Sequence, residues 1–243
     1  MGSCLAERLG RFVSLTANET AALEALEDQP RTYRRDTVIR SENDRSREVF
    51  VVQKGWLHSY ALLSNGSRQI MRLHFPGDII GLSSVAFGQS TDSIMAVTDV
   101  TLCPFDRDRL GKLFEEHPRL SALIFTLCIA ERVSLADRLA SIARTSARAR
   151  VATLLCKLIA RIRLSGGAGL KEFHIPLTQE EIGDATGLTS VHVNRMMRNL
   201  VEDGLIARSG NIITLLNEDR LVAEVNFVDR FAHIDTSWLP APR

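Results

Sequence analysis

The sequence predicts an α+β protein with an N-terminal antiparallel β-barrel or jelly roll, a long helix, and a C-terminal winged helix-turn-helix. Short β-rich runs alternate with turn residues over residues 37–105. Apolar residues then recur every three or four positions over residues 119–143, the period of an amphipathic helix. Residues 176–215 combine two short helical patterns around a glycine turn with two strand-like patterns. The domains expected are therefore a barrel at residues 1–118, the long helix, and a helix-turn-helix domain at residues 144–243.

Length and composition indicate a globular protein. The 243 residues are enough for two domains, and 45% apolar with 24% charged residues is an ordinary balance. The longest nearly apolar run, residues 120–130, is shorter than the roughly 20 residues that a membrane-spanning helix needs. No secretory signal is visible, and no two cysteines form a C-x-x-C pair. We therefore expect a protein of the reducing cytoplasm that does not enter a membrane.

The barrel region contains two strong local signals. Thr16 and Glu19 form a capping-box pattern ahead of an apolar helical repeat, which predicts the first helix. Asn65 and Gly66 lie between two alternating strand patterns, and both residues tolerate a positive φ. This pair predicts a tight β-hairpin.

The apolar stripe of residues 119–143 has two explanations. The helix either packs against its own barrel or pairs with the same helix of a second chain, as in a short coiled coil. A helix of 25 residues without glycine or proline is long for a packing helix, which favours a homodimer. The residues expected at the dimer interface are Leu120, Ile124, Leu127, Leu135, Leu139 and Ile142.

The helix-turn-helix pattern carries specific turn chemistry. Thr178 and Glu181 form a second capping box, and Gly187 supplies the turn before a second helix that begins near Thr189. The second helix of this motif enters the major groove of DNA, where arginine reads guanine and asparagine reads adenine. The residues expected to contact DNA are Thr178, Gln179, Thr189, Ser190, His192, Asn194, Arg195, Arg198 and, at the tip of the wing, Asn211.

The charge distribution agrees with this interpretation. Residues 144–210 carry ten basic and six acidic side chains, a net charge of +4, although the whole chain carries only +1. A locally basic segment fits a polyanionic partner such as double-stranded DNA.

Three motifs follow one another in the order of the three predicted parts. They are KGWLHSY at residues 54–60, FPGDIIG at residues 75–81, and LTQEEIGDATGLTSVHVNRMMRNLVEDGLI at residues 177–206. In these motifs and their order, nearly the full chain resembles the Crp/Fnr family of bacterial transcription regulators. The resemblance implies a homodimer that binds a palindromic operator and contacts RNA polymerase. The two-fold symmetry would set the two recognition helices about 34 Å apart.

The chain departs from the relatives that bind cyclic AMP. Those relatives use a Gly-Glu pair for the ribose and an Arg-Ser pair for the phosphate. Here Gly81 is followed by Leu82, and Asp92 stands where the arginine is expected, so its charge repels a phosphate. We therefore expect an effector other than cyclic AMP, or none. The candidate effector pocket comprises Gly81, Leu82, Ser83, Ser84, Asp92, Ser93 and Leu135.

Other cofactors find little support in the sequence. Oxygen-sensing relatives hold an iron–sulfur cluster with closely spaced N-terminal cysteines, whereas this chain has only Cys4 near its start. Haem remains open through His58 and His74, which lie in predicted strands, although a lone strand histidine is usually structural. A reactive thiol at Cys128 or Cys156 is the remaining chemical switch. We expect no resident cofactor and no metal.

The recognition helix departs from the best-known family pattern, which places a glutamate four residues before an arginine. Val191 occupies the glutamate position here, and Arg195 keeps the arginine position. We expect Arg195 to read a guanine, with Asn194 or His192 reading a different base.

Two other classes of function compete with a DNA-binding regulator. One is a ligand-binding or dimerising module whose helix-turn-helix no longer reads DNA. The cationic face with Arg195 and Arg198 argues against it. The other is an enzyme, for which the sequence offers no Ser/His/Asp order, no glycine-rich phosphate loop and no metal-spaced histidine pair.

Overall fold

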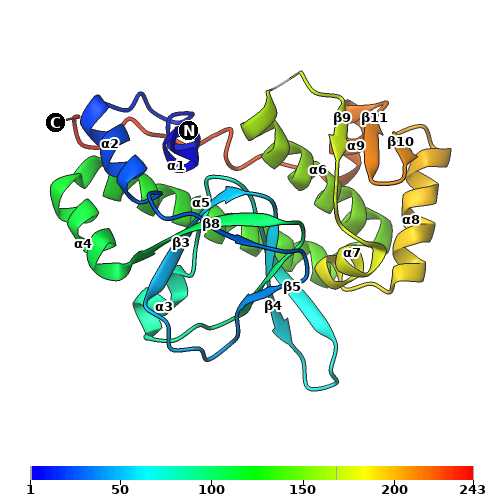
Figure 1. The fold of residues 1–243 in the computed structure, drawn as a ribbon. Coiled ribbons are helices and arrows are strands. Elements are labelled where there is room, and N and C mark those ends of the chain that lie inside the picture. The colour runs from blue at the N-terminus through cyan, green and yellow to red at the C-terminus, as the bar shows by residue number, and fades with distance from the viewer. Residues whose placement is uncertain (1, 168, 243) are drawn as a thin grey trace. The chain divides into compact units, whose positions relative to one another are not determined.

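The computed structural model describes residues 2–167 and 169–242, and these divide into two units (Figure 1). The first unit comprises the chain up to Leu62, the segment Ile70–Ile129 and the residues from Ile234 onward. The second unit comprises Leu63–Gln69 and Ala130–His233. This division differs from the ranges expected from sequence, because the long helix is shared between the units and the end of the chain belongs to the first.

Two short helices open the first unit, α1 (Cys4–Leu9) and α2 (Ala17–Ala25). The capping box predicted for α2 is confirmed. The Thr16 hydroxyl accepts a hydrogen bond from Glu19 N at 3.2 Å, and the Glu19 carboxylate accepts one from Thr16 N at 2.8 Å. Two backbone N–H groups at the start of the helix thus find side-chain acceptors.

Two four-stranded sheets form the body of the first unit. One sheet has the strand order β1-β8-β3-β6 and the other β2-β7-β4-β5. Apolar side chains from both sheets, among them Phe50, Leu57 and Leu102, meet in one buried cluster. This is the antiparallel, jelly-roll type of core that the sequence predicts. The strands are β1 (Arg31–Tyr33), β2 (Val38–Arg40), β3 (Glu48–Lys54), β4 (Leu57–Leu62), β5 (Arg68–His74), β6 (Ile79–Ile80), β7 (Ser93–Ala96) and β8 (Val100–Asp106).

The hairpin between β4 and β5 turns at Asn65 and Gly66, as predicted, but with a different turn. Only Gly66 has a positive φ, 81°. Gly66 N donates to Leu63 O at 2.9 Å, and Leu63 N donates to Ser67 O at 2.8 Å. The loop is therefore one with a single left-handed glycine, in which the Asn65 side chain accepts from Ser67 N at 3.0 Å.

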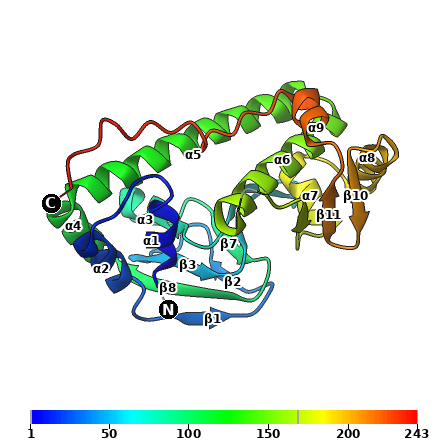
Figure 2. The same cartoon turned by 90° about the horizontal axis from the view of Figure 1, so that it is seen from above.

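Three helices complete the first half of the chain: α3 (Leu82–Phe87), α4 (Arg107–Glu116) and α5 (Pro118–Arg144). Helix α5 has 27 residues, and Figure 2 shows that it is continuous. Among the described residues, no helix is long and apolar enough to cross a membrane.

The burial of α5 corrects part of the dimer interface expected from sequence. Leu120, Ile124 and Leu127 are only 0%, 5% and 7% exposed within the single chain. They are core residues of this chain, so the packing explanation holds for the first half of the stripe. Leu135 and Leu139 are 48% and 69% exposed, and the second half of the helix remains open.

The second unit contains the helix-turn-helix and its wing. Helices α6 (Ala147–Gly166), α7 (Gln179–Thr186) and α8 (Ser190–Glu202) pack against one another. The predicted wing strands are present and antiparallel, and a third strand that the sequence analysis did not foresee extends their sheet. The remaining elements are β9 (Glu172–His174), β10 (Ile206–Ser209), β11 (Ile212–Leu215) and α9 (Glu218–Val225).

Two glycines shape the turn between α7 and α8. Gly187 ends α7 with a φ of 68°, a left-handed conformation that favours glycine. Gly183 lies within α7 and faces the turn that follows this helix. Leu188 N, in the turn, donates to Gly183 O at 3.0 Å. A β-carbon on Gly183 would overlap the carbonyl oxygen of Leu188. The approach of the two helices therefore requires a glycine at this position.

We expect Gly183→Ala to lower the free energy of unfolding by about 1–3 kcal/mol, because the added methyl group forces the turn away from α7. Urea unfolding followed by circular dichroism measures the change. Gly111→Ala in α4 is the matched control, since nothing lies within 4 Å of the β-carbon that it adds. Alanine there stabilises the helix by about 0.5–1 kcal/mol. Equal effects of the two substitutions would contradict the steric argument.

Candidate nucleic-acid interface

Helix α8 has one buried and one exposed face. Val193 and Leu200 are completely buried, and Met197 is 2% exposed, so these residues hold the helix on the second unit. The opposite face brings together the five α8 residues that the sequence analysis expects to contact DNA. The exposed residues of this face are Ser190, Val191, His192, Asn194, Arg195 and Arg198.

The side chains of the two arginines on this face have no partner among the described residues. The guanidinium groups of Arg195 and Arg198 form no hydrogen bond or ion pair with any other residue in the described ranges. Other arginines of the same unit are paired: Arg148 donates to Glu224 at 3.0 Å, and Arg163 donates to Glu218 at 2.9 Å. A guanidinium without a carboxylate partner offers its whole charge and all its donors to an external anion or base.

Both helices of the motif begin at exposed threonines. Thr189 caps α8 and accepts from His192 N at 3.4 Å. The capping box predicted for α7 is confirmed, with Thr178 accepting from Glu181 N at 3.1 Å and donating its own N–H to Glu181 at 2.7 Å. The hydroxyls of Thr178 and Thr189 therefore serve the helix starts, and the two N-termini face solvent, where backbone N–H groups attract phosphates.

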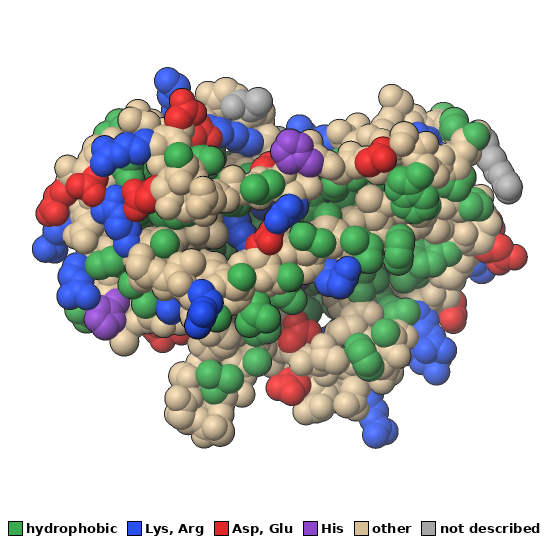
Figure 3. All heavy atoms as spheres, turned by 180° about the vertical axis from the view of Figure 1, so that it is seen from behind, with side chains coloured by type: hydrophobic (Ala, Val, Ile, Leu, Met, Phe, Trp, Pro, Cys, Tyr) green, Lys and Arg blue, Asp and Glu red, His purple; other side chains and the backbone are tan. Residues whose placement is uncertain are grey.

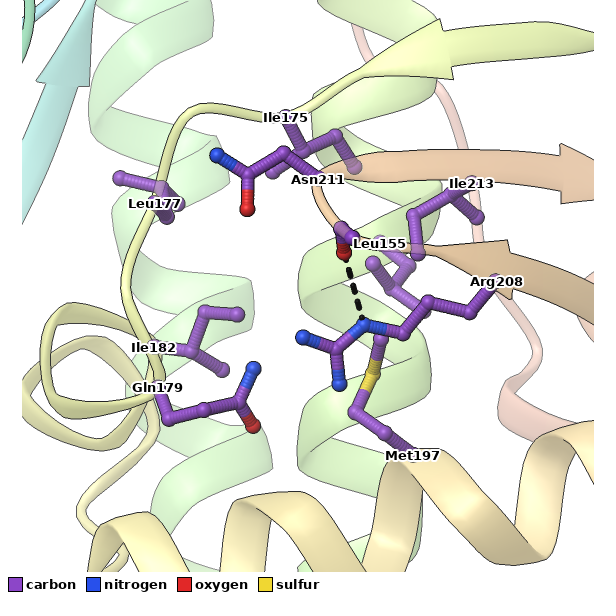
Figure 4. A pocket seen from close by; sticks show the side chains of 10 residues that line it. Leu155, Ile175, Leu177, Gln179, Ile182, Met197, Arg208, Asn211 and Ile213 are labelled. Atoms are coloured by element: carbon purple, nitrogen blue, oxygen red, sulfur yellow. Dashed lines mark hydrogen bonds between the residues drawn. The ribbon is translucent and has the colours of Figure 1, made fainter.

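The wing carries a cation that the sequence analysis missed. Arg208 of β10 donates from Nε to Gly210 O at 3.1 Å. It also donates from Nη2 to the Gln179 amide oxygen at 2.7 Å, in the amide orientation that satisfies both groups. Figure 4 shows these side chains turned toward one another at a small pocket that Asn211 also lines. The available signal was a basic residue two positions before the glycine of the wing tip.

Two half-buried cations connect α5 to other helices of the second unit. Arg138 of α5 donates to Ala185 O at 2.6 Å, near the end of α7. Lys157 of α6 donates to Ser134 O at 2.9 Å. Burial lowers the pKa of Arg138 to about 10. Burial is also the main cause that lowers the pKa of Lys157 to about 8, and the positive charge of Arg138 is the second cause. The first contact ties the end of α7 to the second half of α5, and the second contact ties α6 to it.

The expected effector pocket contains an arginine from outside the predicted set. Arg40, the last residue of β2, is 4% exposed. Its Nη2 donates to Glu48 O at 2.5 Å and to Ser46 Oγ at 3.1 Å, and its Nη1 lies 3.4 Å from Ser84 Oγ. Gly81 makes room for it, because a β-carbon there would lie 2.6 Å from Nη1.

The carboxylates near Arg40 offset only part of the effect that burial has on its pKa. Burial lowers the pKa of Arg40, whereas Glu48, Asp44 and Asp92 act in the opposite direction. Among the other predicted pocket residues, Ser93 Oγ accepts from Glu42 N at 3.0 Å. Leu82 and Ser83 begin α3, and Leu135 belongs to the second unit. The structure thus places Gly81, Ser84 and Asp92 near one cation from an earlier strand.

A second stripe of α5 remains open. Phe125 is 60% exposed and Leu139 is 69% exposed, and Figure 3 shows hydrophobic side chains gathered on the side where α5 lies. The residues of this stripe are spaced alternately three and four positions apart, as the apolar positions of a two-stranded coiled coil are. We call this stripe the seam of α5. The seam consists of Phe125, Cys128, Arg132, Leu135, Leu139 and Ile142. In the first half of this seam, Phe125 and Cys128 each follow by one position a residue expected from sequence, Ile124 and Leu127.

The two histidines considered for haem do not fit that group. His58 and His74 are 0% and 4% exposed, so neither ring is open to the space that a haem plane needs. His74 Nε2 lies 2.8 Å from Ser59 Oγ, and the His58 ring packs edge-on against Tyr60 at 5.4 Å. Both are histidines of the packed core.

The exposed face of α8, beside a wing that supplies a further cation, defines a DNA-binding transcription regulator of the winged helix-turn-helix type. Residues 149–224 match the Crp-like helix-turn-helix domain, and residues 30–117 match the cyclic nucleotide-binding domain. The chain belongs to the Crp/Fnr family of transcription regulators.

Individual relatives extend over most of the chain. The nitrogen fixation regulation protein FixK of Bradyrhizobium diazoefficiens is 32% identical over 217 residues, which cover 89% of this chain and 83% of FixK. The transcriptional activator protein Anr of Pseudomonas aeruginosa is 26% identical, covering 87% of this chain and 86% of Anr. The solved structure of FixK2 from Bradyrhizobium japonicum has a TM-score of 0.73 and 30% identity, covering 83% of this chain and 98% of that one.

Two cysteines are expected to be unreactive in the folded protein. Burial is the main cause that raises the pKa of Cys103 to about 11 and that of Cys156 to about 12, so both thiols stay protonated at neutral pH. Iodoacetamide labelling followed by peptide mass spectrometry should leave them unmodified in native protein and modify both in urea. Rapid native labelling of Cys156 would contradict this assignment and restore it as a thiol switch.

Proposed function

We propose that the protein is a homodimeric regulator that binds a palindromic operator through α8 of each subunit. The observation that carries the proposal is the face of α8, where Arg195, Arg198 and Asn194 project without partners among the described residues. Such donors recognise base edges in the major groove or the phosphates beside it. We assign a guanine to Arg195 and a neighbouring base to Asn194 or His192. Phosphate contacts are assigned to Thr178, Gln179, Thr189, Ser190, Arg198, Arg208 and Asn211.

The open seam of α5 supports the dimer. Leu135 and Leu139 lose contact with water when two copies of the helix pair in parallel, and this burial favours association. A parallel pair has a two-fold axis, which places the recognition helices about 34 Å apart. The operator then consists of two half-sites, one turn of DNA apart.

RNA polymerase is the second proposed partner. A regulator bound beside a promoter changes transcription through contact with polymerase, and the relative from Pseudomonas aeruginosa is named a transcriptional activator. The proposed compartment is the cytoplasm, where operator and polymerase meet.

The proposed effector is a compound other than cyclic AMP, or none. Leu82 and Asp92 stand where a ribose acceptor and a phosphate partner are expected. Arg40 does not take the place of the missing phosphate partner, because its Nη2 already donates to Glu48 O and Ser46 Oγ. Any signal that moves α5 reaches α7 through the contact between Arg138 and Ala185.

We expect Arg195→Ala to weaken binding to the preferred operator by about 1–3 kcal/mol per half-site, because a guanine loses its bidentate partner. The operator is first selected from random duplexes with the wild-type protein. Fluorescence anisotropy at fixed salt then compares the selected site with a scrambled duplex. The loss should be confined largely to the selected site.

Arg208→Ala is the matched control, since it also removes one guanidinium but from the wing. It should weaken binding to both duplexes alike and reduce the slope of log K against log salt by about 0.9 per lost phosphate contact. Equal losses on both duplexes for Arg195→Ala would assign Arg195 to phosphate. If the wild type selects no site at all, the motif is a degenerate helix-turn-helix and the proposal fails.

The dimer has its own test through Cys128. In a parallel two-fold pair, a residue of the seam faces its own copy, within reach of a disulfide. Mild oxidation should therefore give a covalent dimer on a non-reducing gel. Cys128→Ser should abolish this dimer, and Leu139→Lys should reduce it by placing two like charges in the seam.

Cys4→Ser is the control for cross-linking, because Cys4 lies in α1 and its Sγ donates to Gln53 O at 3.3 Å. This variant should still form the covalent dimer. A dimer that persists in Cys128→Ser, or that disappears in Cys4→Ser, would show that α5 is not the interface.

A further inference from the structure

Val191 contributes little to the packing of the second unit, because most of its side chain is exposed. It is 76% exposed, the most exposed of the large hydrophobic side chains in the described part of the chain. The buried side of α8 is formed by other residues, among them Val193, Met197 and Leu200. Val191 is the second residue of the helix and points away from that side.

Helix formation does not explain a valine at this position either. A β-branched side chain loses χ1 freedom in a helix, so valine is a poorer helix former than alanine. An exposed apolar surface also gains nothing from the solvent around it. A single exposed apolar side chain is common on protein surfaces, so it is the place of Val191 among the exposed polar residues of α8 that points to a contact outside the chain.

The neighbours of Val191 identify the chemistry of that contact. Arg195 lies four residues further along α8, so the two side chains stand side by side on one face, with β-carbons about 5–6 Å apart. Ser190 and Asn194 flank them with hydrogen-bonding groups. An apolar protein surface would bury these polar groups unpaired, whereas a DNA groove offers partners to all of them.

The major groove exposes one apolar group, the C5-methyl of thymine. Successive bases of one strand rise about 3.4 Å, so the separation between Val191 and Arg195 corresponds to one or two base steps. We infer that Val191 reads a thymine methyl group one or two steps from the guanine that Arg195 reads. This inference rests on the proposed function and names a specificity determinant within it.

Deoxyuridine provides the test, because it differs from thymidine only in lacking the methyl group. Each thymine of the selected operator is replaced in turn by deoxyuridine, symmetrically in both half-sites, and the Kd is measured by fluorescence anisotropy. One thymine position should stand out for the wild-type protein. The expected loss there is about fourfold per half-site, the factor that corresponds to about 0.8 kcal/mol for one buried methyl group.

Val191→Ala should abolish the difference between thymine and deoxyuridine at that position, while keeping the preference for the guanine assigned to Arg195. Val201→Ala is the matched control, since Val201 is also exposed on α8, at 39%, but lies in its last turn. This control should keep the full sensitivity to deoxyuridine. Cytosine at the sensitive position should bind more weakly than 5-methylcytosine for the wild type and equally for Val191→Ala.

Two results would overturn the inference while leaving the proposed function intact. One is a wild-type protein that binds its selected operator tightly with no thymine position sensitive to deoxyuridine. The other is a Val191→Ala variant that retains the same sensitivity, which would assign the methyl contact to another residue. A wild-type protein that selects no operator would refute the proposed function, and the assignment of Val191 with it.

Discussion

The close approach of α7 to the turn before α8 is the constraint on which the DNA-binding unit depends. Gly183 permits it because a side chain there would overlap Leu188 O, and Gly187 completes the turn with a left-handed backbone. These two positions set the direction in which α8 leaves α7. That direction decides which side of α8 is buried and leaves the opposite side, with Arg195, in solvent. The geometry of the interface thus follows from a backbone contact rather than from the recognition residues themselves.

Charge pairing distinguishes structural from functional arginines in the second unit. Arg148, Arg163 and Arg230 donate to carboxylates and hold elements of the unit together. Arg195 and Arg198 have no such partner among the described residues. Neutralised cations contribute little to attraction of a polyanion, whereas Arg195 and Arg198 keep their full charge on the exposed face of α8.

The first unit contains the cyclic nucleotide-binding domain of the family, and a buried arginine lies beside Gly81 and Ser84 in it. Arg40 enters the cassette from a strand that precedes it and donates to backbone and hydroxyl oxygens. A buried guanidinium in this setting requires those acceptors, because desolvation of an unpaired charge is unfavourable. Arg40 Nη2 donates to both Glu48 O and Ser46 Oγ, so this nitrogen has no further donor for a phosphate. The charge of Arg40 is thus satisfied within the first unit, which supports the proposal of an effector other than cyclic AMP.

Local signals in the sequence determined the helix starts, the glycine turn and the exposed face of α8. The capping boxes at Thr16 and Thr178 and the turn at Gly187 join groups only a few residues apart, so their chemistry is legible in the order of residues. The motifs likewise determined the family. Only the tertiary structure decided that Arg40 reaches Ser84, 44 residues away, and that Arg208 reaches Gln179. It also decided which stripe of α5 is covered, because neighbouring stripes of one helix share the same period and differ only in what packs against them.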